Sequence, residues 1–169
     1  MFENPINILE VKSIYEFVAK DIYGVNVPLK KYRGHVCIIT NVASKCGYAK
    51  FNYAELMDLY DQYEESKGLR VLAFPCNQFG DREPGNSIDI ANYINDNKIR
   101  FDVFEKIEVN GENAHPLWTY LKHKKPGTTR DFIKWNFTKF IVDRMGQPVE
   151  RHGPSTPPKD LVKYLEKYW

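Results

Sequence analysis

Cys46 is the side chain of this sequence with the strongest potential for nucleophilic chemistry. It follows an apolar run at residues 35–42 and precedes a segment, residues 53–63, whose large side chains recur at helical spacing. A helix N-terminus offers unpaired N–H groups and partial positive charge, and the adjacent Lys45 adds a full positive charge. Both favour the thiolate, which is the reactive form of cysteine. The pattern therefore predicts a reactive thiol at the start of a helix.

The other two cysteines, Cys37 and Cys76, lie within and directly after apolar runs. Cys37 is inside the run 35–42, where a small apolar side chain is the normal filling, so we expect it in the core. Cys76 follows the run 69–75 and has two interpretations. It is a residue of a packed strand end, which we favour, or it is a disulfide partner that approaches Cys46.

Gln78, Trp135 and Asn136 are the remaining candidates for a catalytic role. Their two amides and one indole N–H are neutral donors that can stabilise a thiolate and orient a bound oxygen, and none of them competes as a nucleophile. Each taken singly is more often explained by core packing, for tryptophan, or by loop hydrogen bonding, for the amides. Only their combination with Cys46 points to catalysis.

The elements that must position these residues are two buried strands and the helix between them. The run 35–42 is almost continuously apolar or β-branched, as expected of a central strand buried on both faces. The helix over 53–63 follows, with Gly68 as its stop, and a second apolar run at 69–75 ends at a proline. Strand, helix and strand predict a right-handed βαβ unit, which places Cys46 at the carboxyl edge of the sheet, where open α/β folds bind ligands.

The rest of the chain completes an α/β fold with a central mixed, largely parallel sheet flanked by helices. Segments 14–17 and 27–29 predict an N-terminal β-hairpin that turns at Gly24. Helices are expected over 87–95, from Pro116 onward, and at the C-terminus through Leu161 and Leu165. Segments 137–142 and 149–151 predict a second hairpin. We see no repeat and no linker, so we expect residues 1–169 to form a single domain.

Composition and charge exclude several classes of protein. Of the 169 residues, 43% are hydrophobic and 27% are charged, as in ordinary soluble domains, which argues against disorder and membrane insertion. A net charge of +2 is too small and too mixed to indicate nucleic-acid binding. The polar start lacks the pattern of a secretory signal, and three cysteines are not a disulfide framework. We therefore expect a cytoplasmic protein.

Three motifs resemble the signatures of the glutathione peroxidase family. They are Asn-Val-Ala-Ser-Lys-Cys-Gly at 41–47, Phe-Pro-Cys-Asn-Gln-Phe-Gly at 74–80 and Lys-Trp-Asn-Phe-Thr-Lys-Phe at 134–140. The resemblance continues through Glu-Pro-Gly at 83–85, Val-Asn-Gly at 109–111 and His-Pro-Leu at 115–117, from about Ser13 to the C-terminus. It implies a thioredoxin-like fold and the catalytic set Cys46, Gln78, Trp135 and Asn136.

The resemblance also implies a reaction. The Cys46 thiolate attacks the terminal oxygen of a hydroperoxide, releases water or an alcohol and becomes a sulfenic acid. One thiol then forms a mixed disulfide with Cys46, and a second displaces it by thiol–disulfide exchange. The thioredoxin-dependent branch of the family has a resolving cysteine after the Pro-Gly turn, whereas residues 87–104 contain none. We therefore expect glutathione as the reductant, and thioredoxin with Cys76 as resolving thiol is the alternative.

The missing resolving cysteine also resembles the selenocysteine branch of the family, so Cys46 is a candidate stand-in for selenocysteine, with selenium in the natural protein. The stretch 122–133 is short, which resembles the monomeric, phospholipid-hydroperoxide type. Four basic residues near the motifs are candidates for binding glutathione carboxylates or anionic lipid headgroups, and would permit transient contact with a membrane surface. They are Lys45, Lys50, Arg130 and Lys134. A solvated charged face is an equally good interpretation of these four.

The sequence is less favourable to two other functions. One is a thioredoxin-fold module that docks on membranes through its basic face without turnover. The other is metal or nucleotide chemistry, for which the pattern is unfavourable: the four histidines are scattered without paired-ligand spacing, and no glycine-rich nucleotide motif is present. We therefore expect no metal and no tightly bound cofactor, with glutathione as a reducing co-substrate.

Overall fold

A mixed sheet of five strands forms the centre of the molecule, with strand order β5-β4-β3-β6-β7. The computed structural model describes residues 6–128 and 131–169. The parallel part contains β3 (Cys37–Val42), β4 (Arg70–Pro75) and β5 (Asp102–Val103). The antiparallel part adds β6 (Lys139–Val142) and β7 (Pro148–His152). The expected mixed α/β sheet is confirmed, with its parallel and antiparallel pairings equal in number.

The βαβ unit predicted from the two apolar runs is present. Every residue of β3 is buried, as is all of β4 except its first residue, which explains why both read as apolar runs. Between them α1 runs from Ala49 to Tyr63 and so ends before Gly68. Gly68 adopts a φ of +70° in the turn that leads into β4, a conformation that favours glycine.

Three further helical segments flank the sheet. The predicted helix over 87–95 is α2 (Ser87–Asp96), with the capping box formed by Asn86 and Asp89 at its start. The one expected from Pro116 is α3 (Pro116–Lys124). The C-terminal amphipathic segment is a 3-10 turn, η4 (Pro158–Leu161), continued by α4 (Val162–Leu165).

The N-terminal hairpin exists, but its first strand lies later than the sequence suggested. β1 (Val18–Lys20) pairs with β2 (Asn26–Pro28), and the turn between them contains Gly24. Residues 14–17 were expected in the first strand, and that prediction was wrong, because η2 (Ile14–Glu16) is a 3-10 turn, Phe17 is its C-cap and β1 begins at Val18. Ser13 and Glu16 form a capping box there, and side-chain bonds of this kind stabilise a helical turn over an extended strand. Two other 3-10 turns are η1 (Ile8–Glu10) and η3 (Leu29–Tyr32).

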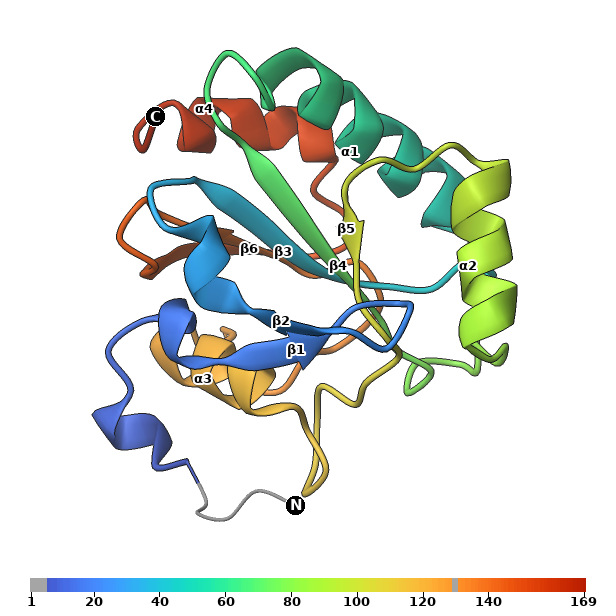
Figure 1. The fold of residues 1–169 in the computed structure, drawn as a ribbon, viewed down its shortest axis with the longest axis horizontal. Coiled ribbons are helices and arrows are strands. Elements are labelled where there is room, and N and C mark those ends of the chain that lie inside the picture. Colours follow the sequence, from blue (N-terminus) through green and yellow to red (C-terminus); the bar gives the residue numbers. More distant parts are fainter. Residues whose placement is uncertain (1–5, 129–130) are drawn as a thin grey trace.

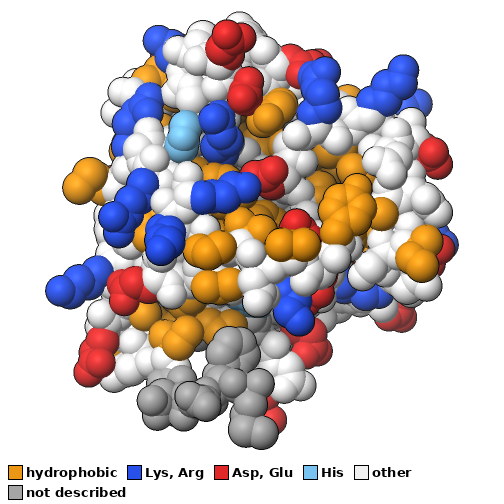
Figure 2. All heavy atoms as spheres, in the orientation of Figure 1, with side chains coloured by type: hydrophobic (Ala, Val, Ile, Leu, Met, Phe, Trp, Pro, Cys, Tyr) orange, Lys and Arg blue, Asp and Glu red, His pale blue; other side chains and the backbone are white. Residues whose placement is uncertain are grey.

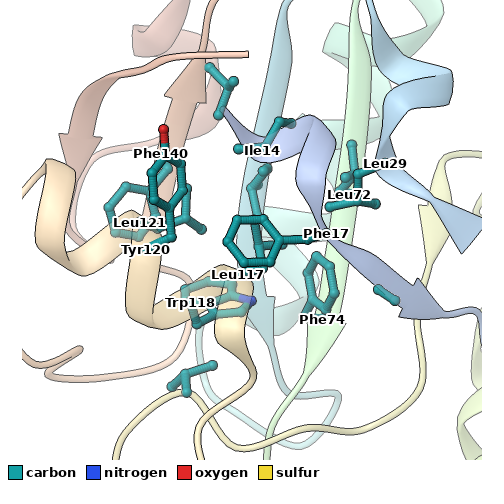
Figure 3. Packing of buried hydrophobic residues seen from close by; sticks show 14 of the residues in the cluster. Ile14, Phe17, Leu29, Leu72, Phe74, Leu117, Trp118, Tyr120, Leu121 and Phe140 are labelled. Atoms are coloured by element: carbon teal, nitrogen blue, oxygen red, sulfur yellow. The ribbon is translucent and has the colours of Figure 1, made fainter. Parts of the chain in front are cut away.

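The sheet separates two apolar layers because alternate side chains of each strand point to opposite faces. On one face α3 packs against β4 and β6, with Trp118 edge-on to Phe74 and Phe140 at ring-centroid distances of 5.9 and 5.8 Å (Figure 3). On the other face α1, α2 and the C-terminal segment cover β3 and β4 (Figure 1). The face seen in the space-filling view mixes basic, acidic and apolar side chains (Figure 2).

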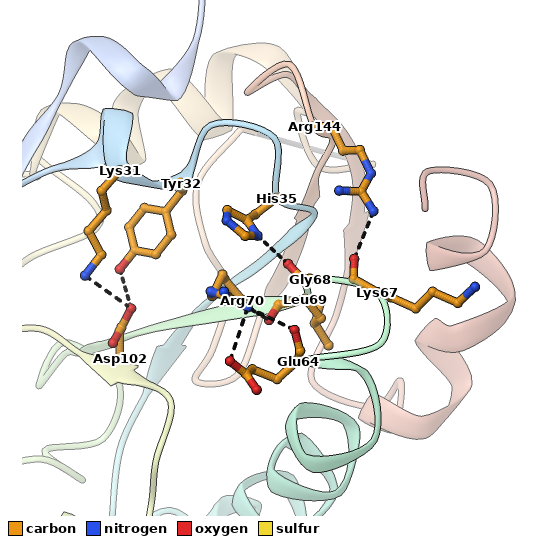
Figure 4. A network of polar contacts seen from close by, with 10 residues as sticks. All are labelled: Lys31, Tyr32, His35, Glu64, Lys67, Gly68, Leu69, Arg70, Asp102 and Arg144. Atoms are coloured by element: carbon orange, nitrogen blue, oxygen red, sulfur yellow. Dashed lines mark hydrogen bonds and ion pairs between the residues drawn. The ribbon is translucent and has the colours of Figure 1, made fainter.

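Hydrogen bonds to main-chain carbonyls close the amino end of the parallel strands. Arg144 donates to the carbonyl of Gly34. It also donates to the carbonyl of Lys67, and His35 Nδ1 lies 2.8 Å from the Gly68 carbonyl oxygen (Figure 4). These contacts join the segments that enter β3 and β4. The opposite, carboxyl end of the same strands is left for the loops that carry the predicted catalytic residues.

Candidate active site

Three loops that carry the predicted catalytic residues leave the sheet at one edge. Val42, the last residue of β3, pairs with Pro75, the last residue of β4. Lys139, the first residue of β6, pairs with Thr40 near the end of β3. Residues 43–48, 76–80 and 135–138 therefore start or finish side by side. This confirms the expectation that Cys46 lies at the carboxyl edge of the parallel strands.

Cys46 sits in two consecutive tight turns between β3 and α1. Its N–H donates to the Ala43 carbonyl at 3.3 Å, and its carbonyl accepts from the N–H of Ala49, the first residue of α1, at 3.0 Å. The residue is 8% exposed and its thiol is free. The cap position Tyr48 contributes no side-chain hydrogen bond, so the N–H groups at the start of α1 are not blocked by a capping side chain. The thiol thus lies next to the positive end of a helix of 15 residues.

Asn41 holds the Trp135–Thr138 segment against the end of β3. Its Nδ2 donates to the Trp135 carbonyl at 3.0 Å, and its Oδ1 accepts from the Thr138 N–H at 3.0 Å. Its own carbonyl accepts from the Phe137 N–H at 2.7 Å. Phe137 has a φ of +62°, an uncommon conformation for a bulky residue, and these bonds fix it in place. Sequence reasoning assigned no role to Asn41, although it opens the first signature motif.

Trp135 and Asn136 are tied to the loop that follows β4. Asn136 is fully buried; its Nδ2 donates to the Phe79 carbonyl at 3.3 Å, and its Oδ1 has no hydrogen-bond partner among the described residues. The Trp135 ring is 36% exposed and lies 6.0 Å from the Phe79 ring, centroid to centroid. A Cβ at Gly80 would be 3.0 Å from the Trp135 Cη2 atom. Both side chains therefore lie against the loop after β4, and we call this pair the Trp135–Asn136 wall.

Gln78 is at the same edge, but its amide is engaged elsewhere. Its Nε2 donates to the Asn110 carbonyl at 2.9 Å, and its Oε1 accepts from the N–H groups of Val109 and Asn110 at 2.7 and 3.1 Å. Within residues 6–128 and 131–169 it forms no hydrogen bond with Cys46. An open groove of about 860 Å³ begins beside Gln78, with Lys106 and His115 among the residues that line it.

Cys37 and Cys76 lie on the opposite side of the sheet from Cys46. Both pack in the cluster that contains α3, whereas Cys46 packs in the cluster that contains α1. Burial raises the pKa of the Cys37 thiol to about 12, and burial likewise raises the pKa of Cys76, whose Sγ is 3.5 Å from Gln78 Oε1. The prediction that Cys37 is a core residue is confirmed. Cys76 is a free, fully buried thiol, as the packed-strand-end interpretation expects.

The predicted binding residues are exposed around this edge. Lys45 and Lys50 flank Cys46 along the chain, and Lys134 precedes Trp135. Lys134 and Arg151 line a hollow of about 200 Å³. Arg130 lies outside the described residues. In the described ranges no group of three or more His, Cys, Asp or Glu side chains could hold a metal ion.

The loop that carries Cys46 is also bonded to residues 82–83, a contact that the sequence did not predict. The Lys45 N–H donates to the Arg82 carbonyl at 3.0 Å. The Glu83 carboxylate accepts from the Ser44 N–H and, at 3.1 Å, from the Ser44 hydroxyl. Glu83 belongs to the Glu-Pro-Gly segment at 83–85, but an acidic residue before a proline gives no signal of burial.

The geometry combines a partly shielded thiol, a helix N-terminus and neutral donors at one edge of a sheet. Such a site suits nucleophilic attack by sulfur on a small electrophile, with no charge on the neighbouring donors to compete for it. The surrounding lysines favour an anionic reactant or an anionic surface.

Comparison with known proteins identifies close relatives of this arrangement. The sequence model of the family described as glutathione peroxidase matches residues 14–122. The phospholipid hydroperoxide glutathione peroxidase of Callithrix jacchus is 51% identical over 160 residues, which cover 94% of this chain and 81% of that protein.

Solved structures share the fold. The crystal structure of T. cruzi GPX1 superposes with a TM-score of 0.78 at 41% identity, over 93% of this chain and 96% of that one. A thiol:disulfide interchange protein of the thioredoxin family from Chlorobium tepidum TLS has a TM-score of 0.67 at 13% identity, over 94% of this chain and 98% of that one. The thioredoxin-like fold expected from the motifs is confirmed.

Proposed function

The chain belongs to the glutathione peroxidase family, and on that premise we propose that Cys46 is the residue whose sulfur accepts an oxygen atom from the peroxide. The enzyme reduces hydroperoxides, including phospholipid hydroperoxides, to water or alcohols, and glutathione is the reductant. The observation that supports the role of Cys46 is its place in two tight turns at the N-terminus of α1, at the sheet edge from which the Trp135–Thr138 segment also leads into β6.

The reaction proceeds in three balanced steps. The thiolate sulfur attacks the terminal peroxide oxygen, the O–O bond breaks, and the departing oxygen takes a proton and leaves as water or alcohol. Glutathione attacks the sulfenic sulfur, which forms a mixed disulfide and releases water. A second glutathione attacks the sulfur of the first, which restores the Cys46 thiol and yields glutathione disulfide. Two electrons pass from two thiols to one peroxide.

Trp135 and Asn136 act as the fixed donors of this site in our proposal. The Trp135 carbonyl accepts from Asn41 and the Asn136 amide donates to the Phe79 carbonyl, so both residues are held in place before charge moves onto the peroxide oxygen. Gln78 is the third donor through its place in the motif. Because its amide is bonded to Val109 and Asn110, that role requires the side chain to exchange these partners for the reacting oxygen.

We propose that an external thiol, and not Cys76, reacts with the oxidised Cys46. Cys46 and Cys76 lie in apolar clusters on opposite faces of the sheet, and burial raises the pKa of Cys76, which lowers its fraction of reactive thiolate. A bridge between the two would require the end of β4 to leave the core. Glutathione reaches the site from solvent without such a change.

Substrate selection is proposed to depend on the basic residues around the edge. Exposed Lys45, Lys50 and Lys134 suit the carboxylates of glutathione or the phosphates of a lipid surface, and the exposed rings of Tyr48 and Phe51 lie on the same stretch of chain. Arg130 is included through its place in the sequence. These residues support transient contact with a membrane surface by a monomeric, cytoplasmic enzyme. In the described residues no helix is long and apolar enough to cross a membrane.

The proposal includes an alternative at position 46, in which the natural protein has selenocysteine in place of cysteine. A selenocysteine there would give the same three steps with selenenic acid in place of sulfenic acid. The codon for residue 46 in the natural transcript distinguishes the two, since UGA specifies the selenol and a cysteine codon the thiol.

A coupled assay with glutathione reductase and NADPH tests the function. We expect hydrogen peroxide and a phospholipid hydroperoxide both to be reduced, Cys46→Ser to be inactive, and Cys76→Ser to keep turnover. Failure of both peroxides with an intact Cys46 thiol would refute the proposal. Loss of turnover in Cys76→Ser, with a Cys46–Cys76 bridge found by peptide mapping after one equivalent of peroxide, would establish the thioredoxin-type alternative.

A further inference from the structure

Glu83 is a buried acidic residue bonded directly to the loop that carries Cys46. It is 3% exposed, and both of its carboxylate oxygens accept from Ser44, one from the N–H and the other from the hydroxyl. A buried carboxylate is costly unless it is hydrogen-bonded or paired. Its hydrogen-bond donors come from Ser44, two positions before Cys46, so the carboxylate is a candidate for a role in the reaction as well as in stability.

The main chain around Glu83 is itself fixed. The Glu83 N–H donates to Asn77 Oδ1 at 2.9 Å. The Lys106 ammonium donates to the carbonyls of Glu83 and Gly85 at 3.0 and 2.6 Å. The carboxylate is therefore mounted on a loop held from two other segments, and it contacts the nucleophile loop from a rigid base.

The bonds from residues 82–83 fall on the turn that presents the thiol. Ser44 and Lys45 are the two central residues of the turn closed by the Cys46 N–H and the Ala43 carbonyl. Glu83 receives the N–H of the first central residue, and the Arg82 carbonyl receives the N–H of the second. Both N–H groups that point outward from this turn are thus held by one dipeptide.

We infer that Glu83 is a positioning residue for the peroxidase reaction, which holds the Ser44–Lys45 turn so that the Cys46 sulfur faces the Trp135–Asn136 wall. The inference rests on the proposed function. The carboxylate form is required, because it offers two acceptor oxygens to the two Ser44 donors, whereas a protonated carboxyl has turned one oxygen into a donor. Displacement of a nucleophile by about 1 Å can lower a rate by about 100-fold.

The charges near Glu83 set the pH range in which its contact with Ser44, here called the clamp, holds the turn. Lys106 and Lys45 are the cations near the carboxylate, and burial, with the Glu83 charge as a further cause, raises the pKa of Tyr53 on α1 and of Tyr93 on α2. Burial raises the pKa of Glu83, and the bonds from Ser44 and the two lysines oppose that rise. Protonation therefore loosens the turn at a pH above the ordinary carboxyl range, and turnover falls as pH decreases through that region.

The test compares Glu83→Gln and Glu83→Ala with the full-length wild-type protein. The rate of Cys46 sulfenylation by hydrogen peroxide is measured by dimedone labelling and mass spectrometry from about pH 5 to 8. At every pH Glu83→Gln has the lowered rate that wild type reaches in acid, since its amide, like a protonated carboxyl, offers one acceptor oxygen and one donor, and it lacks the acid decline attributed to Glu83. Glu83→Ala slows sulfenylation by about 10- to 100-fold at every pH. Exposed Glu65→Gln is the matched control and behaves as wild type.

Each outcome decides the inference. The difference between the wild-type and Glu83→Gln profiles reports the titration of Glu83. Identical profiles, together with a Glu83→Ala rate equal to wild type, would overturn the inference even if both variants had lower melting temperatures. If Glu83→Ala does not fold, Ser44→Ala replaces it, and an unchanged rate in that variant and an unchanged profile in Glu83→Gln would count against the clamp. A wild-type protein without sulfenylation would refute the proposed function itself, a different result from either.

Discussion

Lys139 provides the sharpest quantitative prediction, because it is a fully buried lysine in the third signature motif. It is 0% exposed, and its ammonium donates to the carbonyls of Thr156 and Pro154 at 3.0 and 3.4 Å. It pairs with His152 across β6 and β7. Burial lowers the pKa of Lys139 from 10.5 to about 8, and the Glu55 carboxylate partly opposes that change.

The sign of the effect follows from proton binding. Between pH 8 and 10.5 the unfolded chain holds a proton on Lys139 that the folded chain has released, so the free energy of unfolding rises with pH across this window. The difference of about 2.5 pH units corresponds to about 3 kcal/mol at about 1.4 kcal/mol per unit. Roughly 2 kcal/mol of it falls between about pH 7.5 and 9.5. Below about pH 7.5 the cost of burying the charge is constant.

Lys139→Met removes this titration and keeps an unbranched side chain of similar length. Urea unfolding at about pH 7.5, 8.5 and 9.5 should show wild type gaining about 2 kcal/mol relative to Lys139→Met over that range. Cys37 and the buried tyrosines also titrate in alkaline solution, but they contribute equally to both proteins and cancel in the difference. Exposed Lys20→Met on β1 is the control and should run parallel to wild type. Parallel curves for wild type and Lys139→Met would refute the reasoning.

Two further predictions concern a glycine and a helix cap. Gly80→Ala should cost about 1–2 kcal/mol for a left-handed alanine at φ +69°. It should also lower peroxidase kcat/KM, since the new Cβ displaces the Trp135 ring, whereas Gly24→Ala, with nothing within 4 Å, should show only the stability loss. Asn86→Ala should lose about 1 kcal/mol in urea unfolding, because it removes the capping box that starts α2, and Asn92→Ala on the exposed face should lose none. An undiminished kcat/KM in Gly80→Ala, or equal stability of the two asparagine variants, would contradict these expectations.

The elements could be predicted where one physical signal dominated. The runs 35–42 and 69–75 are apolar because both faces of β3 and β4 are buried, and no competing interaction changes that outcome. The prediction of a strand at residues 14–17 failed because their apolar spacing is compatible with either an extended strand or a helical turn. The decision came from the Ser13–Glu16 capping box, a local side-chain bond that apolar spacing does not register.

The site could be predicted in its types of residue but not in its contacts. The edge of the sheet followed from strand order, and the sequence therefore placed Cys46 correctly. The partners of Gln78 and Glu83 depend instead on loops 30 or more residues away in the chain, at Asn110 and Ser44. A charged side chain such as Lys139 reads as exposed from the sequence, because its burial depends on carbonyls supplied by the distant segment 154–156.

Two separate sets of hydrogen bonds, here called anchors, therefore position the two parts of the site. Asn41, from within β3, fixes the Trp135–Thr138 segment and with it the neutral donors, while Glu83 and Arg82 fix the turn that bears the thiol. Both anchors act mainly on main-chain groups, so loops about 90 residues apart in the chain are fixed at one edge of the sheet by hydrogen bonds. In the proposed reaction the sulfur bonds first to oxygen and then to a second sulfur, and neither anchor is consumed in either step.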